Sequence, residues 1–290
     1  MQPQASPTIW IDGEFRTKET ATVSVYDHGF LYGDGVFEGI RVYSGRVFES
    51  HAHLVRLYES AKSIRMTIPM SLAELSDVLE ACVKKSGMTD SYIRLVVSRG
   101  PGDLGIDPRK SPRPCVIVIV DKINVYPAEV YQTGMAIITS SVTRNHSNAC
   151  PPRVKSLNYL NNVLAKIEAN DAGVYEAIML NSQGNVAECT ADNIFIVRSG
   201  EIQTPGTSEG ILEGVTRRVV MELAKQHSIP LVEKVLQRHD VYIADEVFLT
   251  GTGAEVVPVT KIDGRVIGDG TPGPVTKKIS EVYMKFARGG

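Results

Sequence analysis

The sequence has few cysteines, and no two of them lie close together. The four, Cys82, Cys115, Cys150 and Cys189, form no C-x-x-C pair. Disulfide frameworks belong mainly to secreted chains, and residues 1–7 lack the features of a secretion signal, so we expect free thiols. The ligand spacing of a zinc site is also missing, and we expect no bound metal.

Long apolar runs and a strong charge of one sign are absent as well. The clearest apolar stretch, Cys115–Val120, has the length of one buried strand and not of a membrane-spanning helix. A net charge of −2 provides no positive field to attract nucleic acid. We therefore expect a cytoplasmic protein that binds neither nucleic acid nor membranes.

The length and composition are those of a globular enzyme with two cores. The chain has 290 residues, of which 43% are hydrophobic and 22% charged. Asp121–Thr133 contains Pro127 and no regular pattern, which is typical of a connection between domains. We predict a small α+β domain over residues 1–121, a connecting loop over 122–133 and a large β-rich domain over 134–290, an α/β protein overall.

Turn residues and hydrophobic periodicity predict the elements of both domains. In the small domain we expect hairpins turning at Asp12-Gly13 and Ser44-Gly45, helices over 51–65 and 71–87, and strands over 92–98 and 115–120. In the large domain we expect helices over 156–171, 214–226 and 274–287, strands over 135–139, 177–180, 186–189, 194–197, 231–235 and 246–249, and a hairpin at Asp263-Gly264.

Two motifs that often mark ligand sites have simpler explanations here. Gly100–Gly105 matches G-x-G-x-x-G, but Pro108 and Pro112 follow and forbid the helix that a dinucleotide site requires. We interpret this stretch as a loop. His51 and His53 have a spacing used by some zinc sites, but without a second ligand cluster we expect cap and surface residues.

Lys155 is placed unusually for a solvated lysine. It follows Pro151-Pro152 and stands just before the predicted helix, where the helix dipole disfavours a positive charge. Burial there would lower the pKa of its amine, as a Schiff-base lysine needs. From this spacing alone, a solvated lysine remains the simpler interpretation.

Three further segments offer groups that a charged cofactor could use. Glu188 lies on a short predicted strand, and a buried carboxylate requires a cationic partner such as a pyridinium nitrogen. Gly210–Arg217 is a turn that opens a helix, and Thr250–Ala254 is a glycine-containing turn after a strand. Both can present backbone N–H groups to a phosphate.

Taken together, these segments resemble the class IV pyridoxal-phosphate aminotransferases. Five stretches carry the resemblance, in the family's order: Tyr26–Arg41, His51–Leu57, Lys155–Leu160, Glu176–Phe195 and Gly214–Arg217. Val36–Arg41 and Tyr92–Arg94 are most similar to branched-chain aminotransferases. The resemblance implies the fold type IV of D-amino-acid aminotransferase-like proteins, pyridoxal 5'-phosphate as cofactor, small amino-acid and 2-oxo-acid substrates, and a homodimer or higher homo-oligomer.

The resemblance also implies roles in holding the cofactor. Lys155 would bond to the cofactor aldehyde and act as general acid–base in the 1,3-proton shift. Glu188 would pair with the ring nitrogen and keep it protonated. The remaining positions would bind the phosphate (Arg56, Val215, Thr216, Thr252), hydrogen-bond the ring hydroxyl (Tyr159) and pack on a ring face (Leu212).

For the substrate, the resemblance implies a pocket shared by leucine and glutamate. An apolar part would be lined by Phe37, Gly39 and Tyr32, with Tyr32 reaching a partner subunit. The α-carboxylate would meet Tyr92 and the Thr252-Gly253 backbone, and Arg94 would meet the distal carboxylate of glutamate. Arg41 and Tyr126 are further candidates for this pocket.

Other reactions of the class stay open at this point. D-amino-acid aminotransferases carry an Arg-x-His pair in the loop after the Tyr92 strand, and this loop has Arg109 but no histidine, which disfavours D-specificity. Aminodeoxychorismate lyases have an Arg-Gly loop that Ser98–Gly102 partly resembles, and transaminases of (R)-amines share the frame. Outside the class, the alternatives are a nucleotide-dependent oxidoreductase built on the Gly100 loop and a binding protein without activity.

Overall fold

The chain divides into two compact units. The structure, a computed structural model, describes residues 7–289. Of these residues, 7–123 together with 154–158 form the first unit, and 124–153 with 159–289 form the second. The sequence predicted a boundary in the same stretch but assigned residues 154–158 to the large domain, whereas these five residues make their contacts in the first unit.

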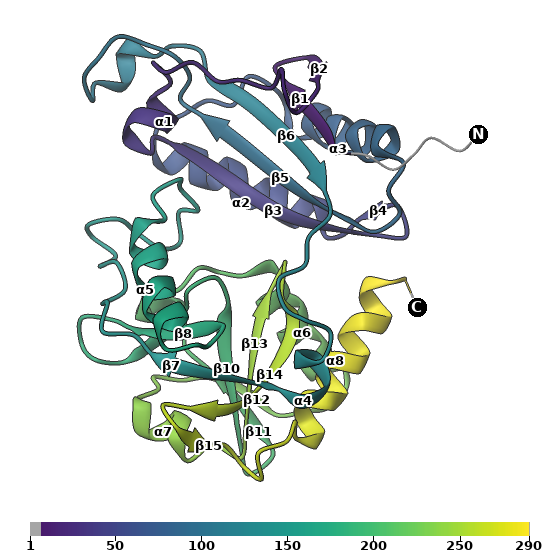
Figure 1. Ribbon diagram of the computed structural model, residues 1–290, viewed down its shortest axis with the longest axis vertical. Helices are drawn as coiled ribbons and strands as arrows, with labels where there is room; N and C mark the ends of the chain where they lie inside the picture. The colour runs from purple at the N-terminus through teal and green to yellow at the C-terminus, as the bar shows by residue number, and fades with distance from the viewer. Residues whose placement is uncertain (1–6, 290) are drawn as a thin grey trace. The chain divides into compact units, whose positions relative to one another are not determined.

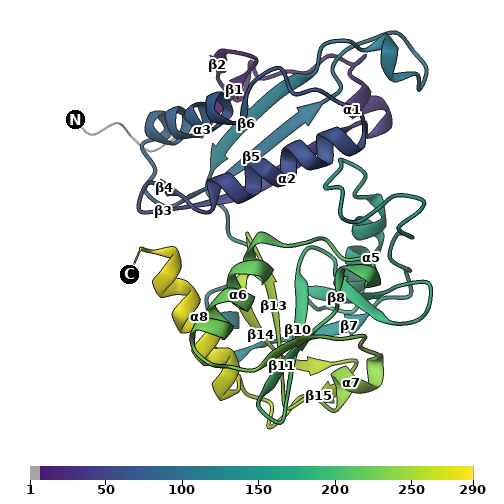
Figure 2. The ribbon, with the colours of Figure 1, turned by 180° about the vertical axis from the view of Figure 1, so that it is seen from behind.

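The first unit is built on an antiparallel sheet with strand order β2-β1-β6-β5-β3-β4. Two long helices, α2 and α3, cover one face of it (Figures 1 and 2). Its strands are β1 (Thr8–Ile11), β2 (Glu14–Arg16), β3 (Gly35–Tyr43), β4 (Arg46–Val47), β5 (Ser91–Ser98) and β6 (Cys115–Asp121), and its helices are α1 (His28–Tyr32), α2 (Ser50–Ser63), α3 (Leu72–Ser86) and the short 3-10 turn Pro108–Lys110.

Local chemistry sets the limits of α3. Ser71 caps α3, its hydroxyl accepting from the Glu74 N–H while the Glu74 carboxylate accepts from the Ser71 N–H, and Gly87 ends the helix in the left-handed conformation. The prediction for this helix is confirmed. Leu54, Leu57 and Leu79 turn inward with no exposed surface and form the core with the buried face of the sheet.

Residues 154–158 extend the sheet along the free side of β3. The Phe37 N–H donates to the Lys155 carbonyl at 3.0 Å, and the Leu157 N–H donates to the Gly35 carbonyl at 2.9 Å. The predicted helix over 156–171 begins only at Leu160, because the backbone of the preceding residues is used for this pairing. The dipole argument for Lys155 is therefore wrong, since the dipole acts within the first turn of a helix.

The second unit holds a curled nine-stranded sheet with the order β12-β11-β10-β13-β14-β7-β8-β9, in which β15 pairs with β14. Helices α6 and α8 lie side by side against it (Figures 1 and 2). The strands are β7 (Met135–Thr139), β8 (Glu176–Leu180), β9 (Val186–Cys189), β10 (Asn193–Arg198), β11 (Glu201–Thr204), β12 (Leu231–Glu233), β13 (Glu246–Gly251), β14 (Glu255–Ile262) and β15 (Arg265–Val266). The helices are α4 (Val130–Thr133), α5 (Leu160–Asp171), α6 (Val215–Gln226), α7 (Arg238–Tyr242), α8 (Pro274–Ala287) and the 3-10 turn Thr207–Glu209.

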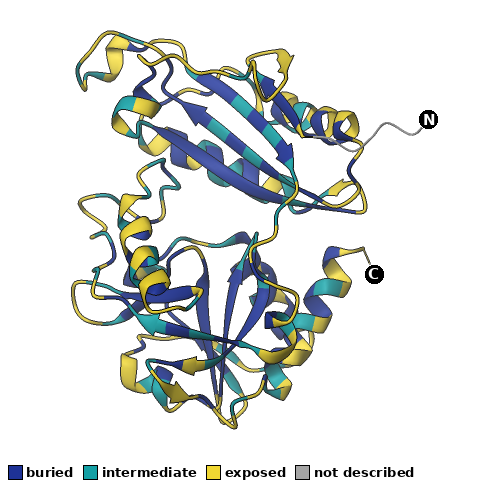
Figure 3. Cartoon of the chain, viewed as in Figure 1, coloured by how far each residue is buried: buried dark blue, intermediate teal, exposed yellow. Residues whose placement is uncertain are grey.

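Helix α5 exposes its apolar face. Leu160, Leu164 and Ile167 recur at helical spacing and are exposed by 69%, 45% and 47%, while Asn162 is buried. Figure 3 shows the exposed residues along this helix. A continuous apolar stripe left in solvent usually marks a surface that another protein covers.

Short elements were the ones that the sequence did not predict. Helices α1, α4 and α7 and strand β11 are missing from the predicted set, and α4 lies inside the segment predicted to be irregular. Each is only four or five residues long, which is too short for a hydrophobic period to show. No helix within residues 7–289 is long and apolar enough to cross a bilayer.

Candidate functional site

Lys155 is fixed through its backbone while its side chain is half-buried. Its N–H donates to the hydroxyl of the buried Ser60 on α2 at 3.2 Å, and its carbonyl accepts from Phe37. The amine lies 4.5 Å from the centre of the Phe37 ring. The backbone of residue 155 is therefore fixed, and its amine lies beside an aromatic ring, which suits a lysine that must reach a cofactor reproducibly.

Phe37, the aromatic neighbour of the Lys155 amine, lies on the face of the sheet opposite α2. Register pairs Gly39 with Arg94 and Arg41 with Tyr92 across β3 and β5, so these side chains share the face of Phe37. The Arg94 guanidinium carbon lies 4.6 Å from the centre of the Phe37 ring and 5.6 Å from that of Tyr92. Aromatic rings thus border a cation that can meet a carboxylate.

Gly39 is needed for the position of Tyr92. A Cβ atom at residue 39 would overlap the Tyr92 hydroxyl, which therefore occupies the space that any other residue would fill. The backbone of residue 39 has no left-handed conformation, so the requirement for glycine is one of space alone.

On the other face of β3, Glu38 forms a buried ionic cluster with two residues of α2. Its Oε1 accepts from Arg56 Nε at 2.7 Å, and its Oε2 accepts from Arg56 Nη2 at 2.8 Å and meets His53 Nδ1 at 2.7 Å. The prediction that His53 is a surface residue is wrong, because only 1% of it is exposed. His51 is exposed as expected.

The charges in this cluster follow from burial and pairing. Burial alone would raise the pKa of Glu38, but the positive charge of Arg56 and the hydrogen bonds hold that pKa well below its usual range. Burial lowers the pKa of His53 by more than the adjacent carboxylate raises it. The cluster therefore holds an ionised Glu38, a cationic Arg56 and a neutral His53 at neutral pH.

In the second unit, Glu188 has buried partners for both carboxylate oxygens. Arg144 donates to Oε1 from Nε at 3.0 Å and lies 2.9 Å from it through Nη2, and the other oxygen accepts from Asn193 Nδ2 at 3.1 Å and the Leu212 N–H at 3.0 Å. The expectation that a buried Glu188 needs a cation is met by Arg144. Sequence reasoning missed this arginine, since it stands in an irregular segment 44 positions away.

Two asparagines of α5 support this ion pair. The Arg144 Nη1 donates to the side-chain oxygens of Asn161 at 3.2 Å and of Asn162 at 3.4 Å. Asn162 also donates to the Thr190 carbonyl at 2.7 Å. These bonds explain why poor helix formers stand in this helix, since their amides orient a buried guanidinium.

The start of α6 can bind an anion. The helix begins at Val215 and Thr216, which are buried, and its first turn contains no acidic side chain. Its first backbone N–H groups have no partner inside the helix and carry the positive end of the helix dipole. Such a start favours phosphate. Thr252 and Gly253 follow β13 in a turn of the same unit and are half-buried.

Tyr126, a candidate for the substrate pocket, is buried in the second unit. Its hydroxyl donates to the Asp192 carboxylate at 3.0 Å. Burial and the nearby Glu176 carboxylate raise the pKa of Asp192 to about 7. Burial and these two carboxylates also raise the pKa of Tyr126, so its hydroxyl remains a donor.

Tyr32 forms a hydrogen bond with the glycine-rich loop Gly100–Gly105 of the first unit. Its hydroxyl accepts from the Gly105 N–H at 2.9 Å, while His28 Nε2 lies 2.9 Å from the Asp103 carbonyl oxygen. Only the 3-10 turn Pro108–Lys110 follows Gly105 before β6, and no α-helix opens there, so the interpretation of this stretch as a loop is confirmed. Its apolar tips Leu104 and Ile106 are exposed by 62% and 84%.

Each unit thus gathers part of the predicted site. The first holds Lys155, Arg56, Tyr32, Phe37, Gly39, Arg41, Tyr92 and Arg94. The second holds Glu188, Tyr159, Leu212, Val215, Thr216, Thr252, Gly253 and Tyr126. Among residues 7–289, no group of three histidine, cysteine, aspartate or glutamate side chains could hold a metal ion.

Comparisons with known proteins agree on one family. Residues 35–262 match the family described as amino-transferase class IV. A branched-chain-amino-acid aminotransferase of Pseudomonas aeruginosa is 40% identical over 287 residues, which cover 97% of this chain and 93% of the relative.

Solved structures give the same result. The Escherichia coli branched-chain amino acid aminotransferase has a TM-score of 0.94 at 36% identity, covering 97% of this chain and 95% of that one. A further branched-chain amino acid aminotransferase, complexed with N-(5'-phosphopyridoxyl)-L-glutamate, has a TM-score of 0.92 at 39% identity, covering 97% and 94%. The predicted fold class is confirmed by these matches.

Proposed function

Because the chain belongs to the class IV aminotransferases, and within them to the branched-chain amino acid aminotransferases, we propose that it transfers the amino group of L-leucine, L-isoleucine or L-valine to 2-oxoglutarate. The reaction is a ping-pong transfer that depends on pyridoxal phosphate. Lys155 carries this proposal, since this half-buried lysine places its amine 4.5 Å from the centre of the Phe37 ring, which the Arg94 guanidinium also contacts. The nucleotide-dependent oxidoreductase alternative is wrong, because the family match covers residues 35–262.

The residues present fit the cofactor by charge and by donor type. Lys155 offers an amine, Glu188 a buried carboxylate, and the start of α6 offers backbone donors for a phosphate. When bound, pyridoxal phosphate supplies an aldehyde for the lysine and a ring that accepts electrons. A relative of 39% identity was solved with pyridoxamine 5'-phosphate.

Lys155 has two tasks in this proposal. Its Nζ would bond to the cofactor aldehyde in the absence of substrate, and as a free amine it would take the proton from the substrate α-carbon and return it in the 1,3-proton shift. The backbone bonds at residue 155 keep the amine within reach for both steps. The aromatic Phe37 on one side limits the access of water.

Glu188 stabilises the protonated ring nitrogen. Arg144 lies 2.9 Å from its carboxylate, and an adjacent cation favours the charged form of a carboxylate, which would hold the proton on the nitrogen. Arg56, Val215, Thr216 and Thr252 hold the phosphate, Tyr159 hydrogen-bonds the ring hydroxyl, and Leu212 packs on the ring.

The substrate pocket combines apolar and charged groups. Phe37, Gly39 and Tyr32 accept the branched side chain, while Tyr92 and the Thr252-Gly253 backbone bind the α-carboxylate. Arg94 donates to the distal carboxylate of 2-oxoglutarate. When leucine is bound, the Arg94 guanidinium remains stacked on the rings of Phe37 and Tyr92. Arg41 and Tyr126 are further candidates for the pocket.

The substrate class can be tested by a panel of donors with 2-oxoglutarate as acceptor. L-leucine, L-isoleucine and L-valine should react with kcat/KM values at least about tenfold above those of D-amino acids and (R)-amines, since the pocket would lose at least one charge-assisted hydrogen bond with them. Preference for an (R)-amine or a D-amino acid would contradict the proposal. So would lyase activity on aminodeoxychorismate without transamination.

Gly39 provides a sharp test of the role of Tyr92. Gly39→Ala should displace the Tyr92 hydroxyl and raise KM for leucine by about tenfold or more, which is the value of one hydrogen bond to a charged group. Gly206→Ala is the matched control, because the nearest atom to its added methyl group would lie at 3.6 Å. An unchanged KM in the Gly39 variant would remove Tyr92 from the carboxylate site.

We further propose that two copies associate through apolar surfaces exposed in each unit. On α5 these are Leu160, Val163, Leu164 and Ile167, and in the first unit they include Val25, Phe30 and Ile106. Light scattering on the purified protein should give at least twice the mass of one chain, and Leu164→Glu should lower it. A monomer at micromolar concentration would contradict this assignment. The cytoplasmic location expected from the composition stays a prediction.

A further inference from the structure

The carboxylate of Glu38 is a fully buried charge that the assigned roles leave unused. It has no exposed surface, and it accepts three hydrogen bonds or ion pairs from two residues of α2. Leaving such a carboxylate without compensation would cost several kcal/mol, so its partners must be well placed. The cluster of Glu38, Arg56 and His53 is therefore fixed in geometry and not merely neutralised.

Glu38 and Arg56 are paired side by side. Arg56 uses its Nε and Nη2, the two donors on one edge of the guanidinium, to reach the two oxygens at 2.7 and 2.8 Å. Such a bidentate pair sets the plane of the guanidinium as well as its position. The Arg56 side chain remains 11% exposed, so it is not sealed inside the cluster.

His53 completes the arrangement from one turn earlier on α2. Its Nδ1 meets the same Oε2 that Arg56 Nη2 reaches, at 2.7 Å. Burial lowers the pKa of His53, so the ring is neutral and donates a hydrogen bond without adding charge. The carboxylate is thus held by one neutral donor and orients one cation.

We propose that Glu38 is a positioning residue that holds the Arg56 guanidinium in the place and orientation at which it binds the cofactor phosphate. The inference rests on the proposed function, in which Arg56 is a phosphate ligand. It goes further by assigning Glu38, with His53 as its support, to the phosphate end of the cofactor. The adjacent Phe37 and Gly39 face the other side of the sheet and belong to the substrate pocket.

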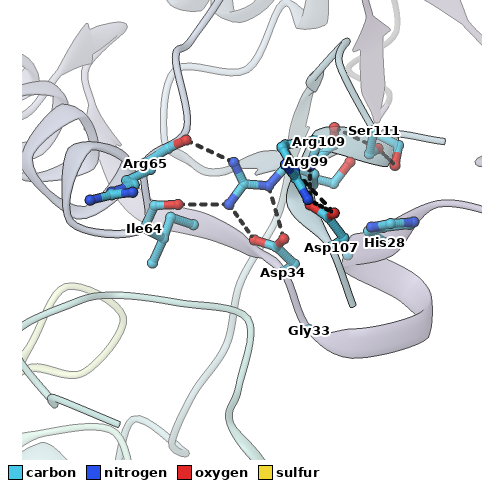
Figure 4. Close-up of polar contacts among 12 residues, drawn as sticks. His28, Gly33, Asp34, Ile64, Arg65, Arg99, Asp107, Arg109 and Ser111 are labelled. Carbon is cyan, nitrogen blue, oxygen red and sulfur yellow. Dashed lines mark hydrogen bonds and ion pairs between the residues drawn. The ribbon is translucent and has the colours of Figure 1, made fainter. Parts of the chain in front are cut away.

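The first unit contains a second buried arginine that serves for comparison. Arg99 pairs with both oxygens of Asp34 at 2.8 Å, and it also donates to the carbonyls of Arg65 at 2.9 Å and Ile64 at 2.7 Å (Figure 4). These backbone acceptors close the end of α2, so this pair has a structural task. Asp34→Asn is therefore a matched control for the loss of one carboxylate beside a buried arginine.

The test compares binding of pyridoxal phosphate and of phosphate-free pyridoxal to the protein after removal of its cofactor. Glu38→Gln should weaken binding of pyridoxal phosphate by about tenfold to a hundredfold, the value of a charge-assisted hydrogen bond. Its affinity for pyridoxal should change by less than about threefold, because that ligand has no phosphate for Arg56 to meet. Asp34→Asn should leave the ratio of the two affinities unchanged.

Arg56→Gln separates failure of this inference from failure of the proposed function. If that variant keeps the full wild-type preference for the phosphorylated ligand, Arg56 is not a phosphate ligand and its assigned role is wrong. If its preference falls while that of Glu38→Gln stays at the wild-type value, only the positioning role of Glu38 is overturned. Combining both substitutions should weaken binding no further than Arg56→Gln alone.

A purely structural role of Glu38 would give a different pattern. Equal losses for pyridoxal phosphate and pyridoxal would overturn the proposal, since misfolding affects both ligands alike. Should Glu38→Gln fail to fold, Glu38→Asp and His53→Gln provide the same comparison, because the first moves the carboxylate and the second removes its support. We expect a selective loss for the phosphorylated ligand in both, and equal losses in both would overturn the proposal.

Discussion

Replacing Lys155 by alanine should abolish the absorbance at the edge of the visible range that cofactor-loaded protein shows, and with it transamination. The amine is the only assigned group that both bonds the cofactor and moves the substrate proton. Loss of general acid–base catalysis alone costs about 10²–10⁴-fold, and loss of covalent attachment adds to it. We therefore expect turnover to fall by about 10⁴-fold or more.

The control for this variant is an exposed lysine of the same unit. Lys62 stands in the last turn of α2, so Lys62→Ala should keep both the absorbance and the turnover. Circular dichroism of the two variants should be the same. A Lys155→Ala protein that retains absorbance and turnover would refute the assignment of this lysine.

Replacing Arg94 by alanine should affect the two substrates of the ping-pong reaction very differently. The guanidinium rests over the rings of Phe37 and Tyr92, where it can meet the distal carboxylate of 2-oxoglutarate. Hydrogen bonds to charged groups contribute about 1.5–3 kcal/mol, so kcat/KM for 2-oxoglutarate should fall about tenfold to a hundredfold. Leucine has no distal carboxylate, and we expect a change of less than about threefold.

Arg94→Lys separates charge from geometry in this prediction. Lysine keeps the positive charge but lacks the planar fork that matches a carboxylate, so its loss for 2-oxoglutarate should lie between those of wild type and alanine. Half-reactions measured separately for leucine and for 2-oxoglutarate provide the readout. Equal losses for both substrates would contradict the idea of one pocket with two uses.

The sequence predicted those elements in which local chemistry determines the structure. The capping box at Ser71, the glycine that ends α3 and the proline at the start of α8 are local signals, and the helices follow them. The predicted start of α5 was wrong because the residues before Leu160 form hydrogen bonds with β3, which lies more than one hundred positions earlier. The helical period of a segment does not show that its first residues pair with a distant strand instead of forming a helical turn.

Periodicity also fails to show which partner an apolar face meets. The leucines of α5 form a stripe whose period predicts a face toward the core, yet the structure exposes them and buries Asn162. The asparagine is buried because Arg144 requires oxygen acceptors. Only the three-dimensional pairing of Arg144 with Glu188 makes that arrangement understandable.

In the site too, residues within family motifs were predicted, whereas residues that matter through distant contacts were not. Lys155 and Glu188 stand in stretches that resemble a known family, and the fold of that family is confirmed. Arg144, Glu38 and His53 were missed or misassigned, since their partners are distant in sequence or lie on another element. The sequence indicates that a buried charge needs a partner, but it does not identify the residue that provides the partner.

The central claim is that this chain uses pyridoxal phosphate to accept an amino group from a branched-chain amino acid. Its most direct test is the absorption spectrum of purified, cofactor-loaded protein before and after addition of L-leucine without any oxo acid. We predict that leucine removes the absorbance of the lysine-bound cofactor and that 2-oxoglutarate restores it. A spectrum that leucine leaves unchanged would contradict the account.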